Sequence, residues 1–383
     1  MPSADPPVVV VTGASAGVGR ATVRKFARQG AKIGLLARGR AGLAGARQDA
    51  EQLGGQAIEL VVDVADADQV EEAAERTEQE FGPIDVWVNN AMCSVFSPVK
   101  EMTAAEYRRV TEVTYLGYVH GTLAALRRML PRDQGVIIQV GSALAYRGIP
   151  LQSAYCAAKH AIQGFNDSLR AELLHDGSHV RLTMVQMPAL NTPQFQWVKS
   201  RLPRKPQPVP PIYQPEVAAE AIYWAAYHDR REWFVGGSTA VVIEGNKLLP
   251  GVGDWYLSRQ GYDSQQYDGH VAPDRADNVF EPVDDQVDFG AHGTFDQRAK
   301  PASYFSLLDR HRHWIALGGC AAALWGGRSR SWLGCCARGF VGASLTALGA
   351  LALGTRPDVY PVRPPPQDQS QQTAAASSQG RQG

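Results

Sequence analysis

The chain has 383 residues, which is long for one domain and allows one large core with appendages. Its 38 basic and 38 acidic side chains cancel, so neither net charge nor a basic run favours nucleic acid as a partner. Five cysteines without metal-binding spacing, and a start without the features of a signal peptide, predict a cytoplasmic protein with no metal site.

Short apolar runs alternate with helical patterns along the first 250 residues. In chain order, the apolar runs predict strands at 8–11, 32–37, 58–62, 84–88, 136–140 and 180–185, with a seventh at 234–243. Helical spacing predicts helices at 17–29, 66–81, 104–130 and 155–174. This alternation predicts an α/β fold, a doubly wound parallel sheet with helices on both faces, formed by a domain at 1–250.

The composition changes after residue 250. Residues 251–310 are predicted to form an extended arm that lies over a surface. Residues 311–355 hold two uncharged apolar runs, which predict helical segments that associate with a membrane as a hairpin, a re-entrant anchor or one tilted span. A helical pair packed in a dimer interface is the alternative. Residues 356–383 are predicted to be a disordered tail.

A glycine-rich turn follows the first predicted strand and opens a helix. Gly13 and Gly17 remove side chains where a backbone must approach a pyrophosphate, and Gly19 lets the helix pack on the strand. The helix N-terminus then offers N–H groups to phosphates. A tight turn without a ligand is the alternative. The loop residues predicted to contact a dinucleotide are Gly13, Ser15, Gly17, Val18 and Gly19.

Four further elements follow this loop in a fixed order. They are Asp63, Asn89-Asn90-Ala91, Ser142 and Tyr155-Cys156-Ala157-Ala158-Lys159. Together with the Thr-Gly-x-x-x-Gly-x-Gly loop, the set resembles the short-chain dehydrogenase/reductase family over roughly residues 8–250. The resemblance implies a Rossmann fold, a nicotinamide dinucleotide as the cofactor, and hydride transfer to or from a carbonyl or alcohol substrate.

The resemblance also implies positions for the cofactor contacts. The further residues expected to contact it are Asp63, Val64, Asn90, Ala91, Tyr155, Lys159, Pro188 and Thr192. Asp63 takes the place of the aspartate that contacts the adenine ring in the family. Met92 and Ala189 stand where the family has glycine, so these two positions depart from the pattern.

The end of the second predicted strand indicates which dinucleotide binds. An acidic side chain there would bind the ribose 2′-hydroxyl of NAD, but Ala37 takes this place and Arg38 follows it. An arginine pairs with a 2′-phosphate, so the sequence predicts NADP as the cofactor. A solvated loop charge is the alternative for Arg38.

Tyr155 and Lys159 are four residues apart, so they share one face of a helix. The ammonium is expected to lower the pKa of the phenol towards neutrality, where it can exchange a proton. The resemblance implies that Lys159 also holds the nicotinamide ribose, and that Ser142 orients the substrate oxygen. Ser142, Tyr155 and Lys159 are therefore the predicted catalytic residues.

Thr114 is a fourth catalytic candidate, because it stands where the family often has an asparagine in a proton relay. That relay runs chiefly through water on the backbone carbonyl of the residue. A threonine keeps the carbonyl, and its hydroxyl favours a helix distortion, so activity is predicted to survive the change.

The segment 193–213 is rich in proline and contains Phe195 and Trp197. Family members often use this region as a substrate lid, which suits a sizeable apolar substrate. A surface loop docked by two aromatic side chains is the alternative.

The predicted function is that of an NADP(H)-dependent oxidoreductase, which the family implies to be a homo-oligomer. Two other classes of function stay open. One is an interaction protein that senses NADP(H) without turnover, and the other is a membrane adaptor whose catalytic domain is vestigial.

Overall fold

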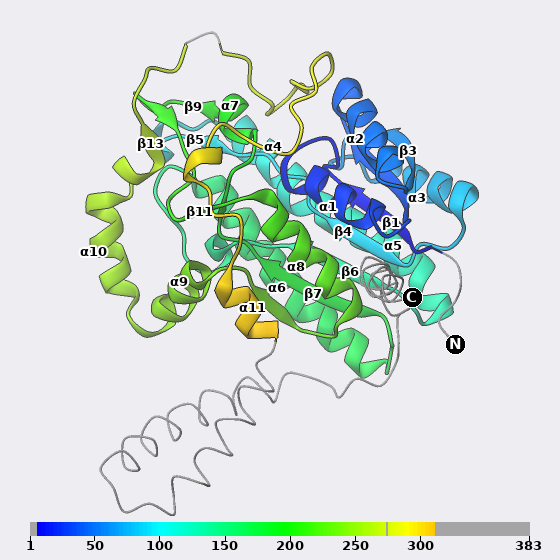
Figure 1. The fold of residues 1–383 in the computed structure, drawn as a ribbon. Helices are drawn as coiled ribbons and strands as arrows, with labels where there is room; N and C mark the ends of the chain where they lie inside the picture. Colours follow the sequence, from blue (N-terminus) through cyan, green and yellow to red (C-terminus); the bar gives the residue numbers. More distant parts are fainter. Residues whose placement is uncertain (1–5, 273–274, 311–383) are drawn as a thin grey trace, which may run out of the picture.

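A seven-stranded sheet forms the centre of the computed structural model, which describes residues 6–272 and 275–310 (Figure 1). The strand order is β12-β7-β6-β4-β1-β2-β3, and all neighbouring strands are parallel. The predicted doubly wound sheet is confirmed. Its strands are β1 (Val8–Thr12), β2 (Lys32–Ala37), β3 (Gln56–Val61), β4 (Val86–Asn89), β6 (Val136–Val140), β7 (Arg181–Gln186) and β12 (Glu232–Phe234).

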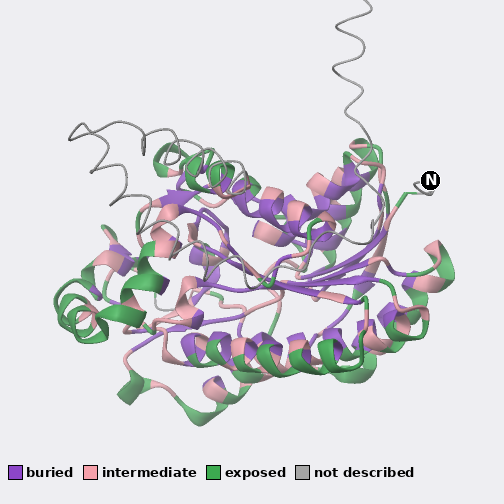
Figure 2. Cartoon of the chain, turned by 90° about the horizontal axis from the view of Figure 1, so that it is seen from below, coloured by how far each residue is buried: buried purple, intermediate pink, exposed green. Residues whose placement is uncertain are grey.

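Helices bury both faces of the sheet (Figure 2). One layer contains α1 (Gly17–Ala27), α2 (Arg40–Gln52) and α8 (Pro215–Tyr227). The other contains α3 (Ala67–Phe81), α4 (Ala104–Thr111), α5 (Gly117–Met129) and α6 (Ser153–His175). In β1, Val9 and Val11 belong to the hydrophobic cluster on one face, whereas Val8 and Val10 belong to the cluster on the other. A strand buried on both faces is apolar throughout, which explains the run of valines.

The strand order reverses between β1 and β4, because the chain first builds outward through β2 and β3 and then returns. Open α/β sheets bind ligands in the crevice at the carboxyl ends of the strands where the order reverses. The glycine loop follows β1 at this place.

Shorter elements surround that end of the sheet. The paired short strands are β5 (Val95–Phe96) with β9 (Lys199–Ser200), β8 (Ala189–Leu190) with β11 (Ile212–Tyr213), and β10 (Lys205–Pro206) with β13 (Gln266–Tyr267). The remaining α-helices of the described residues are α7 (Gln194–Trp197), α9 (Gly237–Leu248), α10 (Pro250–Gln260) and α11 (Tyr304–Arg310). Single 3-10 turns are η1 (Val99–Glu101), η3 (Leu130–Arg132), η4 (Ala143–Ala145), η5 (Asp263–Gln265) and η6 (Asp296–Arg298).

Two of the predicted elements differ from the structure by more than a shift of one or two residues at their ends. The helix predicted at 104–130 is interrupted by a π-helical turn, η2 (Glu112–Leu116). The seventh strand was predicted wrongly beyond residue 234, because the chain turns at Gly236 (φ 81°) and then forms α9. The Thr239 hydroxyl donates a hydrogen bond to the Val235 carbonyl at 2.6 Å, which joins the first turn of α9 to the preceding backbone.

The predicted arm at 251–310 is partly helical, since most of α10 and all of α11 belong to it. Between these helices, residues 276–296 cross the carboxyl edge of the sheet as a chain with only the single turn η6 at its end, drawn in yellow and orange in Figure 1. We call residues 276–296 the strap.

The apolar segments predicted at 311–355 and the tail predicted at 356–383 lie outside the described residues. Of the helices that the structure does describe, none combines the length and the apolar character needed to cross a membrane.

Candidate active site

A cleft of about 810 Å³ opens at the carboxyl ends of β1, β4 and β6. Two of the predicted site residues, Gly19 and Thr114, lie outside its lining. The predicted residues that line it are Gly13, Ser15, Gly17, Val18, Arg38, Asp63, Val64, Asn90, Ala91, Ser142, Tyr155, Lys159, Pro188 and Thr192.

The glycine loop between β1 and α1 leaves no space for side chains. Gly13 has a φ of 65°, and a Cβ there would lie 2.9 Å from the Cα of Ala91. A Cβ at Gly19 would collide with the carbonyl oxygen of Gly13. Ala16 at the N-cap of α1 makes no side-chain hydrogen bond, and the first N–H of the helix, that of Gly17, donates to the carbonyl of Gly290 in the strap at 3.1 Å. The loop fits the pyrophosphate of a dinucleotide.

Asn90 joins the ends of β1 and β4. Its Nδ2 atom donates to the carbonyls of Thr12 at 3.0 Å and Gly13 at 3.2 Å, and its N–H donates to the Thr12 hydroxyl at 2.9 Å. The residue thereby holds the glycine loop while it lines the cleft. Met92 does not have the positive φ that would demand a glycine, so the departure at this position causes no backbone strain.

The opposite end of the cleft lies beside β2 and β3. Asp63 accepts a hydrogen bond from Arg109 at 2.5 Å, and Arg38 donates to the carbonyls of Asn278 at 2.5 Å and Phe280 at 2.8 Å. Arg38 is therefore held by the strap instead of extending into solvent. Sequence reasoning missed the strap residues that line this end, because they follow β2 by about 240 positions and no local motif marks them.

Tyr155 and Lys159 lie on α6, one turn apart. Lys159 is buried, and its Nζ atom donates to the Val140 carbonyl at 2.7 Å and to the Tyr118 hydroxyl at 2.9 Å. Nζ lies 5.6 Å from the centre of the Tyr155 ring. Tyr118 was not anticipated from the sequence, and its position in the middle of a predicted helix gave no signal of this contact.

Burial controls the titration of both groups. It raises the pKa of Tyr155 above that of an ordinary phenol, and a hydrogen bond with Ser142 opposes this rise. Burial also lowers the pKa of Lys159 to about 7. The expected net lowering of the Tyr155 pKa by the ammonium is not seen in this arrangement, because the burial of the phenol outweighs the other influences on it. Tyr155 is consequently protonated at neutral pH.

Ser142 follows β6 and faces the same cleft. Its N–H donates to Oε1 of Gln186 at 2.7 Å, which fixes the backbone. Its Oγ atom accepts from the N–H of Leu144 at 3.1 Å, so the hydroxyl proton is left to donate to another oxygen.

Thr114 lies within the π-helical turn and is buried. Its hydroxyl donates to the Cys93 carbonyl at 2.9 Å and accepts from the Cys93 N–H at 3.1 Å. The side chain thus pins the distorted helix to the segment that follows β4. This agrees with the expectation that the hydroxyl favours a helix distortion.

The turn after β7 carries Pro188 and Thr192, which both line the cleft near the glycine loop. A Cβ at Gly17 would lie 3.2 Å from the Cβ of Thr192. In the same turn, the Asn191 side chain accepts from the N–H of Phe295 at 3.0 Å and donates to Asp296 at 2.8 Å. This turn therefore also anchors the end of the strap.

The end of the cleft that Phe195 lines is largely apolar. Phe195 is buried, and its ring packs edge-on against Phe96 and Phe295, with centroids 6.2 Å and 5.9 Å away. It both docks the 193–213 segment and lines the cleft. Leu249, between α9 and α10, and Trp255 of α10 also line the cleft, although 63% and 60% of their surfaces are exposed.

Comparisons with known proteins agree with this architecture. A family model described as short chain dehydrogenase matches residues 7–202. The uncharacterized oxidoreductase YxnA of Bacillus subtilis is 34% identical over 260 residues, which cover 67% of this chain and 73% of that protein. Dehydrogenase/reductase SDR family member 7B of Mus musculus is 36% identical over 192 residues, covering 48% of this chain and 58% of its own length.

Solved structures show the same fold. The crystal structure of levodione reductase superposes with a TM-score of 0.54 at 26% identity, and the match covers 61% of this chain and 98% of the other. These matches agree with the seven-stranded parallel sheet and the glycine loop in identifying the family of the chain. The protein belongs to the short-chain dehydrogenase/reductase family of NAD(P)-dependent oxidoreductases.

Proposed function

We propose that the protein is an NADP(H)-dependent oxidoreductase that interconverts a carbonyl and an alcohol. The observation that carries this proposal is that Ser142, Tyr155 and Lys159 line one cleft together with the glycine loop. A proton-transfer group and a dinucleotide cradle in a shared cavity are what hydride transfer to a carbonyl requires. The family membership supports the same class of reaction.

Each of the three side chains has a chemical role that follows from its state. A nicotinamide held in this cleft would supply or accept the hydride. Tyr155 is protonated at neutral pH, so it can give its proton to the oxygen of a carbonyl under reduction. The Ser142 hydroxyl, which is hydrogen-bonded to Tyr155, is placed to donate its proton to that oxygen. Lys159, held by Val140 and Tyr118, supplies a donor for ribose hydroxyls and, in its protonated form, positive charge beneath Tyr155.

Arg38 supports NADP(H) as the cofactor. Its guanidinium lines the cleft at the end of β2, where the residue that would accept from a 2′-hydroxyl is replaced by Ala37. A guanidinium attracts a 2′-phosphate in two-point contact. The proposed cofactor contacts are those of the glycine loop, Arg38, Asp63, Val64, Asn90, Ala91, Pro188 and Thr192.

The apolar end of the cleft supports a sizeable apolar substrate. Leu249 and Trp255 lose exposed apolar surface if such a molecule binds against them, which favours binding. The predicted homo-oligomer and the predicted membrane association of 311–355 stay predictions.

The test is NADPH oxidation by the full-length protein across aldehydes, ketones, steroids and quinones, with Tyr155→Phe measured in parallel. We expect turnover of at least one apolar carbonyl, reduced by at least about a hundredfold in Tyr155→Phe, because the proton donor is lost. Tyr304→Phe is the matched control, since Tyr304 is 80% exposed and lies outside the cleft lining. Equal turnover in all three proteins would overturn the assignment of Tyr155.

A nucleotide-sensing protein without turnover is the second candidate. The observation that favours it is the engagement of Lys159 by the Val140 carbonyl and Tyr118. Tight NADPH binding with no oxidation of the cofactor by any carbonyl of the panel would favour this function over the enzyme.

A further inference from the structure

The strap is fastened across the nucleotide end of the cleft at several points. Arg38 donates to the carbonyls of Asn278 and Phe280, and Arg109 donates to that of Val279 at 2.9 Å. Val279 is fully buried in one of the two main hydrophobic clusters. The first part of the strap is therefore integrated into the fold.

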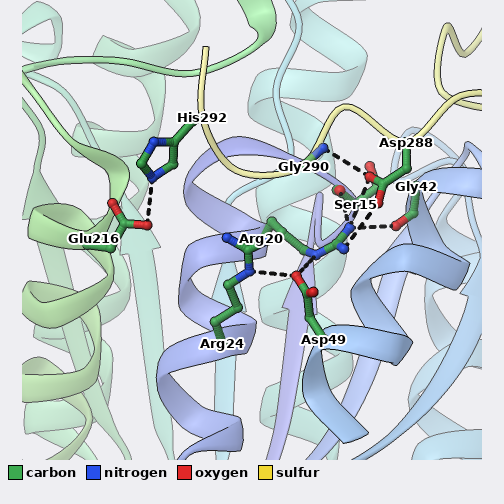
Figure 3. A network of polar contacts seen from close by, with 9 residues as sticks. All are labelled: Ser15, Arg20, Arg24, Gly42, Asp49, Glu216, Asp288, Gly290 and His292. Carbon is green, nitrogen blue, oxygen red and sulfur yellow. Dashed lines mark hydrogen bonds and ion pairs between the residues drawn. The ribbon is translucent and has the colours of Figure 1, made fainter. Parts of the chain in front are cut away.

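A buried arginine fastens the second part of the strap (Figure 3). Arg20 on α1 is 2% exposed, and two of its nitrogens donate to the Asp288 carboxylate, both at 3.2 Å. The same guanidinium donates to Asp49 at 2.6 Å and to the carbonyls of Ser15 and Gly42. Since Arg20 projects from the helix that the glycine loop opens, the strap is bonded directly to the nucleotide-binding unit.

Between these two anchors, Asp284 is pressed against the start of α2. Its backbone carbonyl accepts from the N–H of Gly42 at 3.0 Å. A Cβ at Gly42 would lie 2.6 Å from Oδ2 of Asp284, and a Cβ at Gly39 would collide with the same carboxylate. The two glycines make room for the carboxylate beside the residue that follows β2. Asp284 and Arg38 both line the cleft there.

The charge of Asp284 acts on the group that would select the nucleotide. Burial and then Arg109 lower the pKa of Arg38, whereas Asp63 and Asp284 are among the groups that raise it. A carboxylate near the end of β2 is the group that accepts hydrogen bonds from an adenosine 2′-hydroxyl and repels a 2′-phosphate. β2 itself lacks this acid, because Ala37 takes its place.

We propose that Asp284 is a second specificity-determining residue for the nucleotide, supplied by the strap, and that it opposes the preference set by Arg38. The proposal rests on the proposed function only in requiring that a nicotinamide dinucleotide binds in this cleft. Arg38 attracts a 2′-phosphate, while Asp284 weakens that attraction and accepts from a 2′-hydroxyl. The strap therefore leaves the protein able to bind NADH as well as NADPH, with a smaller difference in affinity than Arg38 alone would give.

The test is direct titration of NADPH and NADH into the full-length protein, with Asp284→Asn as the variant. Neutralising one like charge near a phosphate is expected to raise the ratio Kd(NADH)/Kd(NADPH) by about tenfold at low salt. Adenosine 2′,5′-bisphosphate and 5′-AMP are titrated as probes that need no nicotinamide, and the bisphosphate alone should gain affinity. The gain should shrink as the ionic strength rises.

Asp285→Asn is the matched control, because this neighbouring carboxylate caps the Arg40 N–H at 3.2 Å but does not line the cleft. It removes the same charge and keeps the acceptor, so the affinity ratio should change much less. An unchanged ratio in Asp284→Asn, or an equal change in Asp285→Asn, would overturn the inference. If Asp284→Asn unfolds, Asp284→Ser removes the same charge, and the ratio Kd(NADH)/Kd(NADPH) is measured on that variant. Failure of every probe to bind would instead contradict the proposed function.

Discussion

The Nζ atom of Lys159 lies 2.9 Å from the hydroxyl oxygen of Tyr118, and both atoms donate to the carbonyl oxygen of Val140. This triangle is fully buried beneath Tyr155. It explains how a lysine with almost no exposed surface is tolerated, since a buried amine needs hydrogen-bond acceptors. It also makes the charge of Lys159 depend on a residue of α5 that no motif of the family identifies.

Replacement of Tyr118 by phenylalanine tests this dependence. The change removes one of the two acceptors of Lys159, so the pKa of the amine should fall below its present value of about 7. If the ammonium assists Tyr155, kcat/KM at pH 7 should drop by about tenfold, and its alkaline limb should move to lower pH. Profiles of kcat/KM between pH 5.5 and 9 provide the measurement. An unmoved limb would show that Tyr118 does not set the charge of Lys159.

The buried lysine also predicts how stability depends on pH. Its pKa is about 7 in the folded protein against an ordinary value of 10.5, so between these values the unfolded chain binds the extra proton. The free energy of unfolding should therefore rise with pH from about 7 towards 10.5. Lys159→Met should abolish this rise, and below pH 7 it should be the more stable protein, because the natural protein must bury a charged amine there.

Urea denaturation of the nucleotide-free protein at pH 6, 8 and 10 would measure this effect. Lys247→Met is the control, because the side chain of Lys247 is half exposed and its loss should leave the pH dependence unchanged. Parallel pH profiles for Lys159→Met and the natural protein would contradict the buried, weakly basic lysine.

The sequence predicted the elements that local patterns of apolar residues specify. β2 and β6 were predicted with the bounds that the structure gives, because both are short, mostly apolar runs bounded by glycine or polar residues. The glycine loop and Tyr155 lie at one cleft because each follows a strand or opens a helix at the same edge of the sheet. Gly236 accounts for the misread end of β12, since apolar residues suit either a strand or a helix once the chain has turned.

Long-range contacts were beyond sequence reasoning. Arg20 and Asp288 are separated by 268 positions, and each would pass for an ordinary surface charge in the sequence. Asp284 likewise reads as one of several acids in an irregular segment, although it lies against Gly39 in the fold. Such pairings depend on where the returning chain crosses the sheet, which local patterns do not specify.

The contact between Thr114 and Cys93 gives a third prediction. Thr114→Val keeps the shape of the side chain but leaves the N–H and the carbonyl of Cys93 without this buried partner. The variant should lose about 2 kcal/mol of stability, as measured by urea denaturation, and part of its turnover. Thr114→Ser retains the hydroxyl and should lose less than half of this. A natural protein without turnover that gains it on Thr114→Asn would contradict the view that the threonine suffices.

The ion pair between Arg20 and Asp288 predicts how firmly the strap is held. Asp288→Asn removes the charge but keeps a hydrogen-bond acceptor, and Arg20 retains Asp49 as a partner, so the fold should persist. Because the Asp288 side chain is 36% exposed, we expect the free energy of local opening of the strap to fall by only about 1 kcal/mol. This corresponds to about fivefold faster cleavage by chymotrypsin within the strap.

Mass spectrometry of the early fragments would locate the cut, and the exposed Asp268→Asn serves as the control. NADPH should slow the cleavage in both variants if the strap covers a bound nucleotide. Equal cleavage rates for Asp288→Asn, Asp268→Asn and the natural protein would show that the strap is held by its other contacts, above all those of Arg38 and Arg109.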